Sequence, residues 1–261
     1  MAEDLLVLEK ERLNKVNSIL VSQPEPKDDK SPYFGLAEKY NLKIDFRPFI
    51  QIDPVDVKEF RQQKIKILDH SAIILTSRNA VDHVFRLAAE SKVEIPADMK
   101  YFCISEQTAN YLQKYIVIRK RKIFTGERTA QDLIEVLKKH KTEKFLFPCS
   151  NIRKDDIPNF LEENEYDFNE AIIYKTVASD LSDLSNVNYD VLAFYSPSGI
   201  ESLFTNFPDF KQNKTRIAVF GPTTAQAARD AGLIIDIQAP LPNAPSMTGA
   251  LEYYIKEANG L

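Results

Sequence analysis

Short continuous apolar runs alternate along the chain with segments in which apolar residues recur at the helical spacing of about 3.6 residues. The clearest case is the stretch 191–232, where the runs Val191–Phe194 and Ile217–Phe220 each lead through a polar turn into a helical pattern. Such runs are typical of strands buried in a parallel sheet. The stretch therefore predicts two strand–turn–helix units.

The same alternation continues through the rest of the chain. Further strands are predicted at 16–21, 69–75, 101–104, 144–147 and 171–177, and an extended segment at 42–52. Helices are predicted at 33–40, 129–139 and 159–163. Two more helices follow the turns after 69–75 and 101–104 and end at residues 87 and 114. Strands that alternate with helices predict an α/β fold with parallel sheets.

The second half of the chain repeats the order of the first. The turn Thr76-Ser77 corresponds to Tyr195-Ser196, Ser105–Thr108 to Gly221–Thr224, Thr129-Ala130 to Ser246-Met247, and 145–177 to 19–52. The offset, roughly 115 to 126 residues, exceeds the period of solenoid repeats, which is typically about 20 to 50. The repeat unit is therefore a whole domain, and we predict two similar doubly wound domains with a cleft between them.

After each of the extended segments 42–52 and 171–177, the chain passes from one predicted domain to the other. We interpret them as paired crossover strands that join the domains. This interpretation predicts an N-terminal helical extension at 1–16, a discontinuous α/β domain at 17–45 plus 175–261, and an inserted α/β domain at 46–174.

Composition narrows the classes of function. The net charge of −4 argues against nucleic-acid binding, and the basic run 119–122 is typical of a solvated turn. Two cysteines, Cys103 and Cys149, make no disulfide framework, and three histidines without metal-ligand spacing predict no metal site. With neither a membrane-length apolar run nor a signal-peptide pattern, the sequence predicts a cytoplasmic protein without membrane contact.

The turns after the predicted strands place hydroxyl and backbone N–H groups at helix N-termini, where the helix dipole favours anions. Each hydroxyl alone is more simply a helix N-cap. As a repeated set at the ends of the strands, where open α/β sheets bind their ligands, they predict an anion-binding site. The set comprises Ser77, Ser105, Thr108, Ser196, Ser198, Thr223, Thr224 and Ser246.

The sequence resembles the uroporphyrinogen-III synthase family. The matching stretches, in the family's order and spacing, are ILTSRNAV (74–81), AIIYKTV (171–177), FYSPSGIESL (194–203) and AVFGPTTAQAARDAGL (218–233), within a resemblance that covers about residues 17–256. The resemblance implies two α/β domains joined by a two-stranded ladder, whose cleft takes the linear tetrapyrrole hydroxymethylbilane. It also implies a lyase that removes the terminal hydroxyl as water and closes the ring with ring D inverted, without metal or organic cofactor.

Tyr174 matches the tyrosine that, in this family, is proposed to assist departure of the hydroxyl. A phenol with an ordinary pKa of about 10 is protonated at neutral pH, so it is a credible general acid. The alternative is a strand tyrosine packed at the hinge. The azafulvene that forms on loss of water is itself electrophilic, so we expect that positioning of the substrate carries much of the rate.

Two further residues are candidates for contacts with substrate carboxylates. Arg216 stands where family members often carry a basic residue and could pair with a propionate; the alternative is a solvated charge before a strand. Asn79 stands where some relatives have arginine, so its contact would be a hydrogen bond instead of an ion pair.

The chain departs from the family pattern at Gln23, Ser105 and Ser150, while Arg153 and Lys154 remain as a basic pair. These departures keep an alternative open: a non-catalytic relative that binds a tetrapyrrole or a partner protein in the same cleft. A periplasmic-type binding protein is a third option, but it would carry an export signal. We further expect a monomer whose two domains hinge about the ladder.

Overall fold

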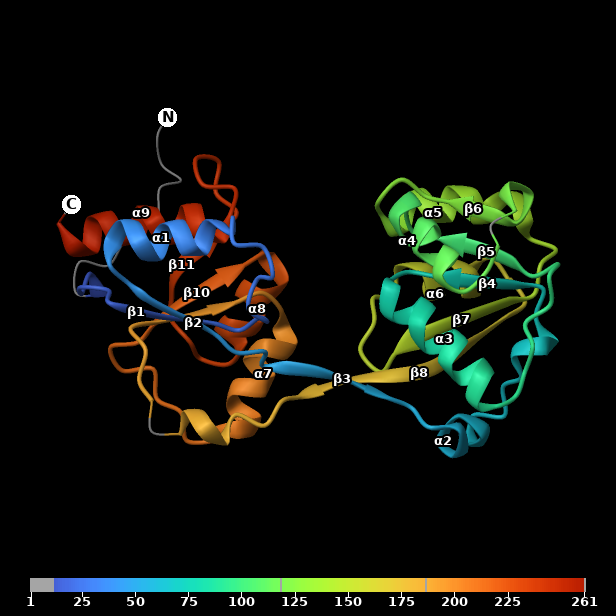
Figure 1. Cartoon of the computed structure of the whole chain (residues 1–261), viewed down its shortest axis with the longest axis horizontal. Coiled ribbons are helices and arrows are strands. Elements are labelled where there is room, and N and C mark those ends of the chain that lie inside the picture. Colours follow the sequence, from blue (N-terminus) through green and yellow to red (C-terminus); the bar gives the residue numbers. More distant parts are fainter. Residues whose placement is uncertain (1–11, 118, 186, 261) are drawn as a thin grey trace. The chain divides into compact units, whose positions relative to one another are not determined.

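The computed structural model describes residues 12–117, 119–185 and 187–260, and the chain divides into two compact units (Figure 1). Unit 1 comprises the described residues up to Gln51 and from Val177 onward, and unit 2 comprises Ile52–Thr176. The chain therefore passes between units at 51/52 and 176/177, slightly later than the predicted 45/46 and 174/175. Residues 1–11 of the predicted N-terminal extension lie outside the described residues, and residues 13–17 form no helix.

Unit 1 contains a five-stranded sheet in the order β11-β10-β9-β1-β2, in which each strand runs parallel to its neighbours. Its elements are β1 (Ser18–Val21), α1 (Pro32–Tyr40), β2 (Lys43–Phe46), the 3-10 helix η6 (Ser182–Leu184), β9 (Val191–Phe194), α7 (Pro197–Asn206), β10 (Arg216–Phe220), α8 (Pro222–Asp230), β11 (Ile235–Ala239) and α9 (Met247–Asn259). Successive strand residues face opposite sides, so Ile19 packs with α1 and α9 while Leu20 packs with α7 and α8. Figure 1 shows α1 and α9 side by side over one face.

Unit 2 contains a six-stranded sheet in the order β3-β8-β7-β4-β5-β6. Its elements are β3 (Ile50–Pro54), α2 (Val57–Gln62), η2 (Ile67–Asp69), β4 (Ala72–Leu75), α3 (Arg78–Glu90), β5 (Lys100–Cys103), α4 (Glu106–Tyr111), η3 (Leu112–Lys114), η4 (Lys120–Lys122), β6 (Ile123–Thr125), α5 (Ala130–Leu137), η5 (Lys138–His140), β7 (Phe145–Ser150), α6 (Asp156–Glu163) and β8 (Phe168–Ala178). Helices α3 and α4 cover one face and α5 and α6 cover the other. The fully buried β4 is sandwiched between these layers.

The two sheets share one topology. The strands β8-β7-β4-β5-β6 of unit 2 lie in the same spatial order as β2-β1-β9-β10-β11 of unit 1, and along the chain the series β1, β2, β4, β5, β6 is repeated by β7, β8, β9, β10, β11. This correspondence confirms the predicted internal repeat and the α/β class with parallel sheets. Strand β3 is an addition at the edge of the second sheet, next to β8.

The predicted extended segment 42–52 is extended but not continuous, and its second part, β3, lies next to β8 as the predicted pair of crossover strands requires. The segment forms two strands that belong to different sheets, β2 and β3, with Arg47-Pro48-Phe49 between them. Proline lacks the N–H that a ladder requires, which favours a break at Pro48. The sequence pattern also missed α2, whose N-terminus is capped by Asp56 through a 2.7 Å bond from the backbone N–H of Glu59.

The described end of the N-terminal extension is attached to unit 1. Arg12 pairs with Asp236, and the Tyr254 hydroxyl donates to the Arg12 carbonyl at 2.6 Å. Asn259 accepts from the backbone N–H of Val16 at 2.8 Å and donates to its carbonyl at 3.1 Å. Residues 12–16 therefore form an irregular arm that is held by side chains of β11 and α9.

Candidate active site

The predicted hydroxyl turns lie at the carboxyl edges of the two sheets, and their serines cap the helices that follow. The backbone N–H three residues on donates to Ser77 at 3.1 Å, to Ser105 at 3.4 Å, to Ser196 at 3.2 Å and to Ser246 at 3.0 Å. These bonds confirm the N-cap interpretation for all of them. The first backbone N–H groups of each helix still lack intrahelical partners, so the turns keep donors for a ligand.

The other members of the predicted set differ in exposure. Asn79, at the second position of α3, and Thr223, at the second position of α8, are exposed, and Ser198 is half-buried. Thr108 and Thr224 are buried, with 6% and 1% of their surface exposed. The two buried hydroxyls therefore pack into their units instead of facing a ligand.

Gly221 gives the turn before α8 its shape. It caps the helix with φ of 86°, a left-handed conformation that strongly favours glycine. The corresponding cap in unit 2, Ser105, has an ordinary extended φ of −153°. Pro222 has no N–H and Gly221 donates to the Ala239 carbonyl at 2.7 Å, so the backbone donors of the motif GPTT are those of Thr223 and Thr224, whereas its counterpart offers a hydroxyl.

A cavity of about 310 Å³ opens at the carboxyl edge of unit 2. Its lining residues come from the ends of β4, β5, β7 and β8 and from the starts of α5 and α6: Thr76, Ser77, Ile104, Ala130, Phe147, Cys149, Ser150, Ile152, Arg153, Lys154, Asp156, Ile157 and Tyr174. The hydroxyls of Tyr174 and Ser77 lie 3.4 Å apart. Ser150 is the direct neighbour of Tyr174 across the β7–β8 pairing. The structure thus brings the predicted Tyr174 and Ser77 together at one cavity.

Tyr174 is a buried phenol, with 8% of its surface exposed. Burial raises the pKa of Tyr174, and the hydrogen bond with Ser77 partly opposes this rise. The ring of His83, on α3, stacks on the tyrosine ring at a centroid distance of 5.0 Å and an interplanar angle of 25°. The phenol is therefore protonated at neutral pH and can donate a proton into the cavity.

The two cations of the cavity differ in how far their charge is neutralised. Arg153 forms ion pairs with Glu170 and with Asp155. Lys154 is exposed, and no ion pair of Lys154 occurs in the described parts of the chain. Lys154 is therefore the cation that remains open to an anionic ligand.

Arg216 lies apart from these turns. It is the first residue of β10, at the amino end of the strand, and only 2% of its surface is exposed. Its guanidinium donates to the carbonyls of Lys214 at 2.7 Å and Lys15 at 3.1 Å and lies 3.8 Å from Asp190. In a parallel sheet the amino ends of the strands lie opposite the helix N-termini that follow them, so Arg216 does not join the hydroxyl turns. The alternative of a solvated charge is also wrong.

Sequence reasoning missed two contacts near the carboxyl edges. One is His83, which follows Ser77 on the same helix. The other is a hydrogen-bonded pair of phenols in unit 1, Tyr33 and Tyr195, in which Tyr195 stacks on Phe220 at 5.7 Å and 25°. Tyr195 lies inside the motif FYSPSG, and that position was the available signal.

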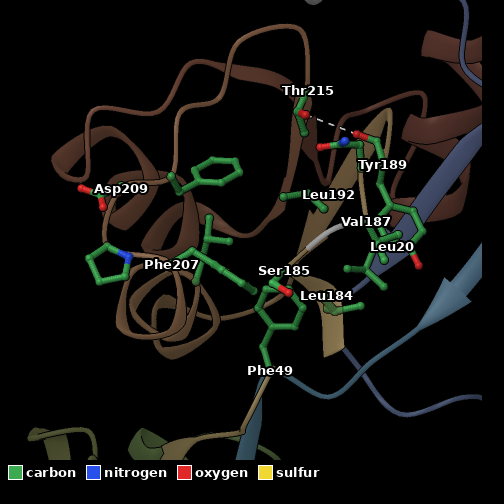
Figure 2. Close-up of a pocket in the computed structure, with 14 residues that line it drawn as sticks. Leu20, Phe49, Leu184, Ser185, Val187, Tyr189, Leu192, Phe207, Asp209 and Thr215 are labelled. Carbon is green, nitrogen blue, oxygen red and sulfur yellow. Dashed lines mark hydrogen bonds between the residues drawn. The ribbon is translucent and has the colours of Figure 1, made fainter. Parts of the chain in front are cut away.

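Unit 1 also contains an apolar cavity of about 410 Å³ (Figure 2). Leu20 and Leu192 line it from β1 and β9, and Phe49 and Phe207 add aromatic rings to the lining. At its rim the Thr215 hydroxyl donates to the carbonyl of Tyr189 at 3.2 Å. No residue of the predicted site lines this cavity, and the described residues that line it include no lysine or arginine to pair with a polyanionic ligand.

The described ranges contain neither a metal-binding cluster nor a membrane-spanning helix. No group of three or more His, Cys, Asp or Glu side chains is arranged to hold a metal ion within residues 12–117, 119–185 and 187–260. Over the same ranges, every helix is too short or too polar to cross a bilayer.

A family model described as uroporphyrinogen-III synthase HemD matches residues 31–249. The chain is 25% identical to the uroporphyrinogen-III synthase of Saccharomyces cerevisiae over 211 residues, which cover 70% of this chain and 75% of the yeast protein. The match spans most of both described units.

Solved structures agree on the fold. A uroporphyrinogen-III synthetase from Helicobacter pylori aligns with a TM-score of 0.58 and 17% identity over 92% of this chain and 99% of its own. A mutant uroporphyrinogen III synthase from Thermus thermophilus aligns with a TM-score of 0.56 and 16% identity over 94% of this chain and 100% of its own. The family model covers most of the chain, so this chain belongs to the uroporphyrinogen-III synthase family, whose members are cyclising lyases of tetrapyrrole biosynthesis.

Proposed function

We propose that this protein converts hydroxymethylbilane into uroporphyrinogen III, with loss of water and inversion of ring D. The observation that carries the proposal is the buried phenol of Tyr174 beside the Ser77 hydroxyl, at a cavity on the carboxyl edge of a sheet. In a member of this family, a protonated phenol at that edge supports a role in departure of the substrate hydroxyl.

In the proposed step the C–O bond of the terminal hydroxymethyl group breaks. The Tyr174 phenol gives its proton to the leaving oxygen, which departs as water, and the pyrrole nitrogen supplies the electron pair that forms the azafulvene. Ring D then attacks the azafulvene carbon through the α-carbon that already carries its bridge to ring C. The bond from that α-carbon to the bridge breaks, and the released bridge carbon bonds to the other α-carbon of ring D, which leaves ring D inverted. The proton that is lost when the ring system regains aromaticity restores the phenol, so no net charge or redox equivalent is left over.

Burial raises the pKa of Tyr174, which keeps the phenol protonated at neutral pH but makes it a weaker acid, so the proposed role rests on the position of the phenol at the cavity. The contribution of a general acid is bounded, typically about 10²- to 10⁴-fold. The azafulvene is inherently reactive, so we assign most of the remaining acceleration to folding of the bilane that brings ring D to the reacting carbon.

Acetate and propionate groups on each pyrrole make the substrate a polyanion. We propose that the exposed N-terminal turns of α3, α7, α8 and α9 bind these carboxylates through Asn79, Ser196, Ser198, Thr223 and Ser246, with backbone N–H groups beside them. Lys154 adds a cation at the cavity of unit 2. Arg216 is left out of the set because it is buried at the opposite end of its strand.

We also propose that the protein acts as a monomer in the cytoplasm. Its cysteines, Cys103 and Cys149, are buried free thiols, and burial raises the pKa of both, which suits a reducing compartment. Sedimentation of the purified protein at micromolar concentration would show a mass near 29.9 kDa if the monomer proposal is right. A mass twice as large would overturn it.

The activity is tested by supplying hydroxymethylbilane and separating the product isomers. The bilane cyclises spontaneously to the uninverted type I isomer, so a reaction without enzyme sets the background. We expect type III as the main product with the protein present. Type I alone would overturn the proposal, and retention of the tetrapyrrole without conversion would instead support the non-catalytic binding alternative.

A further inference from the structure

Tyr174 is contacted at two different places by residues of α3. Ser77, which caps the helix, meets the phenol hydroxyl, and His83 covers a face of the ring. The hydroxyl contact is long, at 3.4 Å, and a hydrogen bond of that length restrains a side chain weakly. The stacked ring therefore provides the firmer restraint on the direction in which the phenol points.

His83 is itself held by Arg86, one helical turn further along α3. The Nε–H of Arg86 donates to Nδ1 of His83 at 3.2 Å, so Nδ1 carries no proton and the neutral ring has its proton on Nε2. Burial lowers the pKa of His83, and the positive charge of Arg86 lowers it further, against the opposing effects of Asp82 and Glu90. The ring stacked on Tyr174 is thus a neutral imidazole of one tautomer.

The same guanidinium also fixes the backbone next to Tyr174. Arg86 donates to the carbonyl of Ile173 at 3.3 Å and to that of Val55 at 2.7 Å, and it pairs with Glu90 at 2.7 Å. Ile173 directly precedes Tyr174 in β8. One arginine therefore sets both the ring that covers the phenol and the strand position from which the phenol projects.

We propose that His83 is a positioning residue for Tyr174, holding the phenol toward Ser77 and the cavity through a ring stack that Arg86 orients. This inference rests on the proposed function. The ring acts through its position, because the stack fixes the direction of the phenol without placing a charge beside it. Small misplacement of a reacting group lowers the rate steeply, so the stack matters to turnover more than to substrate binding.

The test compares His83→Leu, which removes the ring, with His83→Phe, which keeps a ring for stacking, in the native protein and in Tyr174→Phe. We expect His83→Leu to lower kcat roughly tenfold with KM changed by less than about twofold. His83→Phe should stay within about threefold of the native kcat. In the Tyr174→Phe background, His83→Leu should cause no further loss, because there is no phenol left to position.

An equal loss from His83→Leu in both backgrounds would overturn the proposal, since it would mark a general effect on folding. A rise in KM at constant kcat would also overturn it, since His83 would then bind substrate. Ring flipping of Tyr174, followed by NMR, gives a readout that needs no activity. The flip rate should rise in His83→Leu, and an unchanged rate would overturn the inference even if the native protein makes type III product. A native protein that makes only type I would overturn the proposed function instead.

Discussion

The carboxyl edges of the two sheets have the same backbone arrangement but differ in the contacts of their tyrosine side chains. Both have serine-capped helices after corresponding strands, and Ser77 and Ser196 adopt nearly the same backbone conformation. In unit 1 the phenols of Tyr33 and Tyr195 bond to each other. In unit 2 a single phenol, Tyr174, faces a serine hydroxyl and a cavity. The repeated fold therefore supplies serine-capped turns in both units, whereas the phenol that we propose as the proton donor faces a serine hydroxyl and a cavity in unit 2.

The largest expected effect on kcat distinguishes Tyr174 from Tyr195. Tyr174→Phe should lower kcat roughly 100-fold without abolishing activity, because general acid catalysis is lost while positioning of the bilane remains. Tyr195→Phe, the matched control in unit 1, should stay within about fivefold of the native kcat. Type III formation under substrate saturation measures both. A well-folded Tyr174→Phe with no activity, or a larger loss from Tyr195→Phe, would contradict the assignment of the chemistry to unit 2.

The cap residues before α8 and α4, Gly221 and Ser105, differ in backbone conformation, and exchanging glycine and serine at these positions should therefore have different effects on stability. Gly221→Ser should cost about 1–2 kcal/mol of stability, because φ of 86° strains a residue with a side chain. The matched change in unit 2, Ser105→Gly, should cost only a few tenths of a kcal/mol. Urea denaturation measures both changes. Equal costs would show that the left-handed turn is not what distinguishes the GPTT motif.

The topology could be predicted because it depends on local patterns: apolar runs, turn residues and cap residues recur in the same order in both halves. Ser77 and Ser196 are found in this way. The contacts that distinguish the two edges join residues far apart in the chain, and the residue numbers of Tyr33 and Tyr195 differ by 162. His83 meets Tyr174 only after α3 packs on β8. Such pairs depend on register and packing, so a motif can mark one member, as FYSPSG marks Tyr195, but it does not identify the partner.

Arg216 shows the limit of resemblance as a guide. Its position beside a family motif predicted a carboxylate contact, but the start of a strand and its end lie at opposite edges of the sheet. The arginine instead bonds carbonyl oxygens of the N-terminal arm and of Lys214. Strand direction, applied to each candidate residue, would have excluded it.

Charge at the cavity of unit 2 should have a moderate effect on substrate binding. Lys154→Gln should raise KM for hydroxymethylbilane roughly threefold to tenfold, and the rise should shrink with added salt, because an exposed ion pair is screened. Lys211→Gln removes an exposed charge from unit 1, away from the predicted turns, and should leave KM unchanged. Equal changes in the two variants would indicate a general charge effect instead of a site at the cavity.

The smallest effect concerns stability at alkaline pH. Burial raises the pKa of Tyr33 and Tyr195 in the folded state, whereas unfolded tyrosines ionise at about 10. Their contribution to stability is thus complete below pH 10 and is lost as the pH rises toward the folded-state pKa. Urea denaturation at pH 8, 9.5 and 10.5 should show this loss, and Tyr195→Phe should reduce it. An equal loss in Tyr195→Phe would contradict the account of the phenol pair.

The most direct measurement of the central claim is a single turnover of hydroxymethylbilane with the protein in excess. Every bilane then starts on the protein, so spontaneous closure contributes little. We predict that nearly all of the product is the inverted type III isomer, and that Tyr174→Phe slows its appearance without changing the isomer. Product consisting of the type I isomer, formed at the rate seen without protein, would contradict the claim.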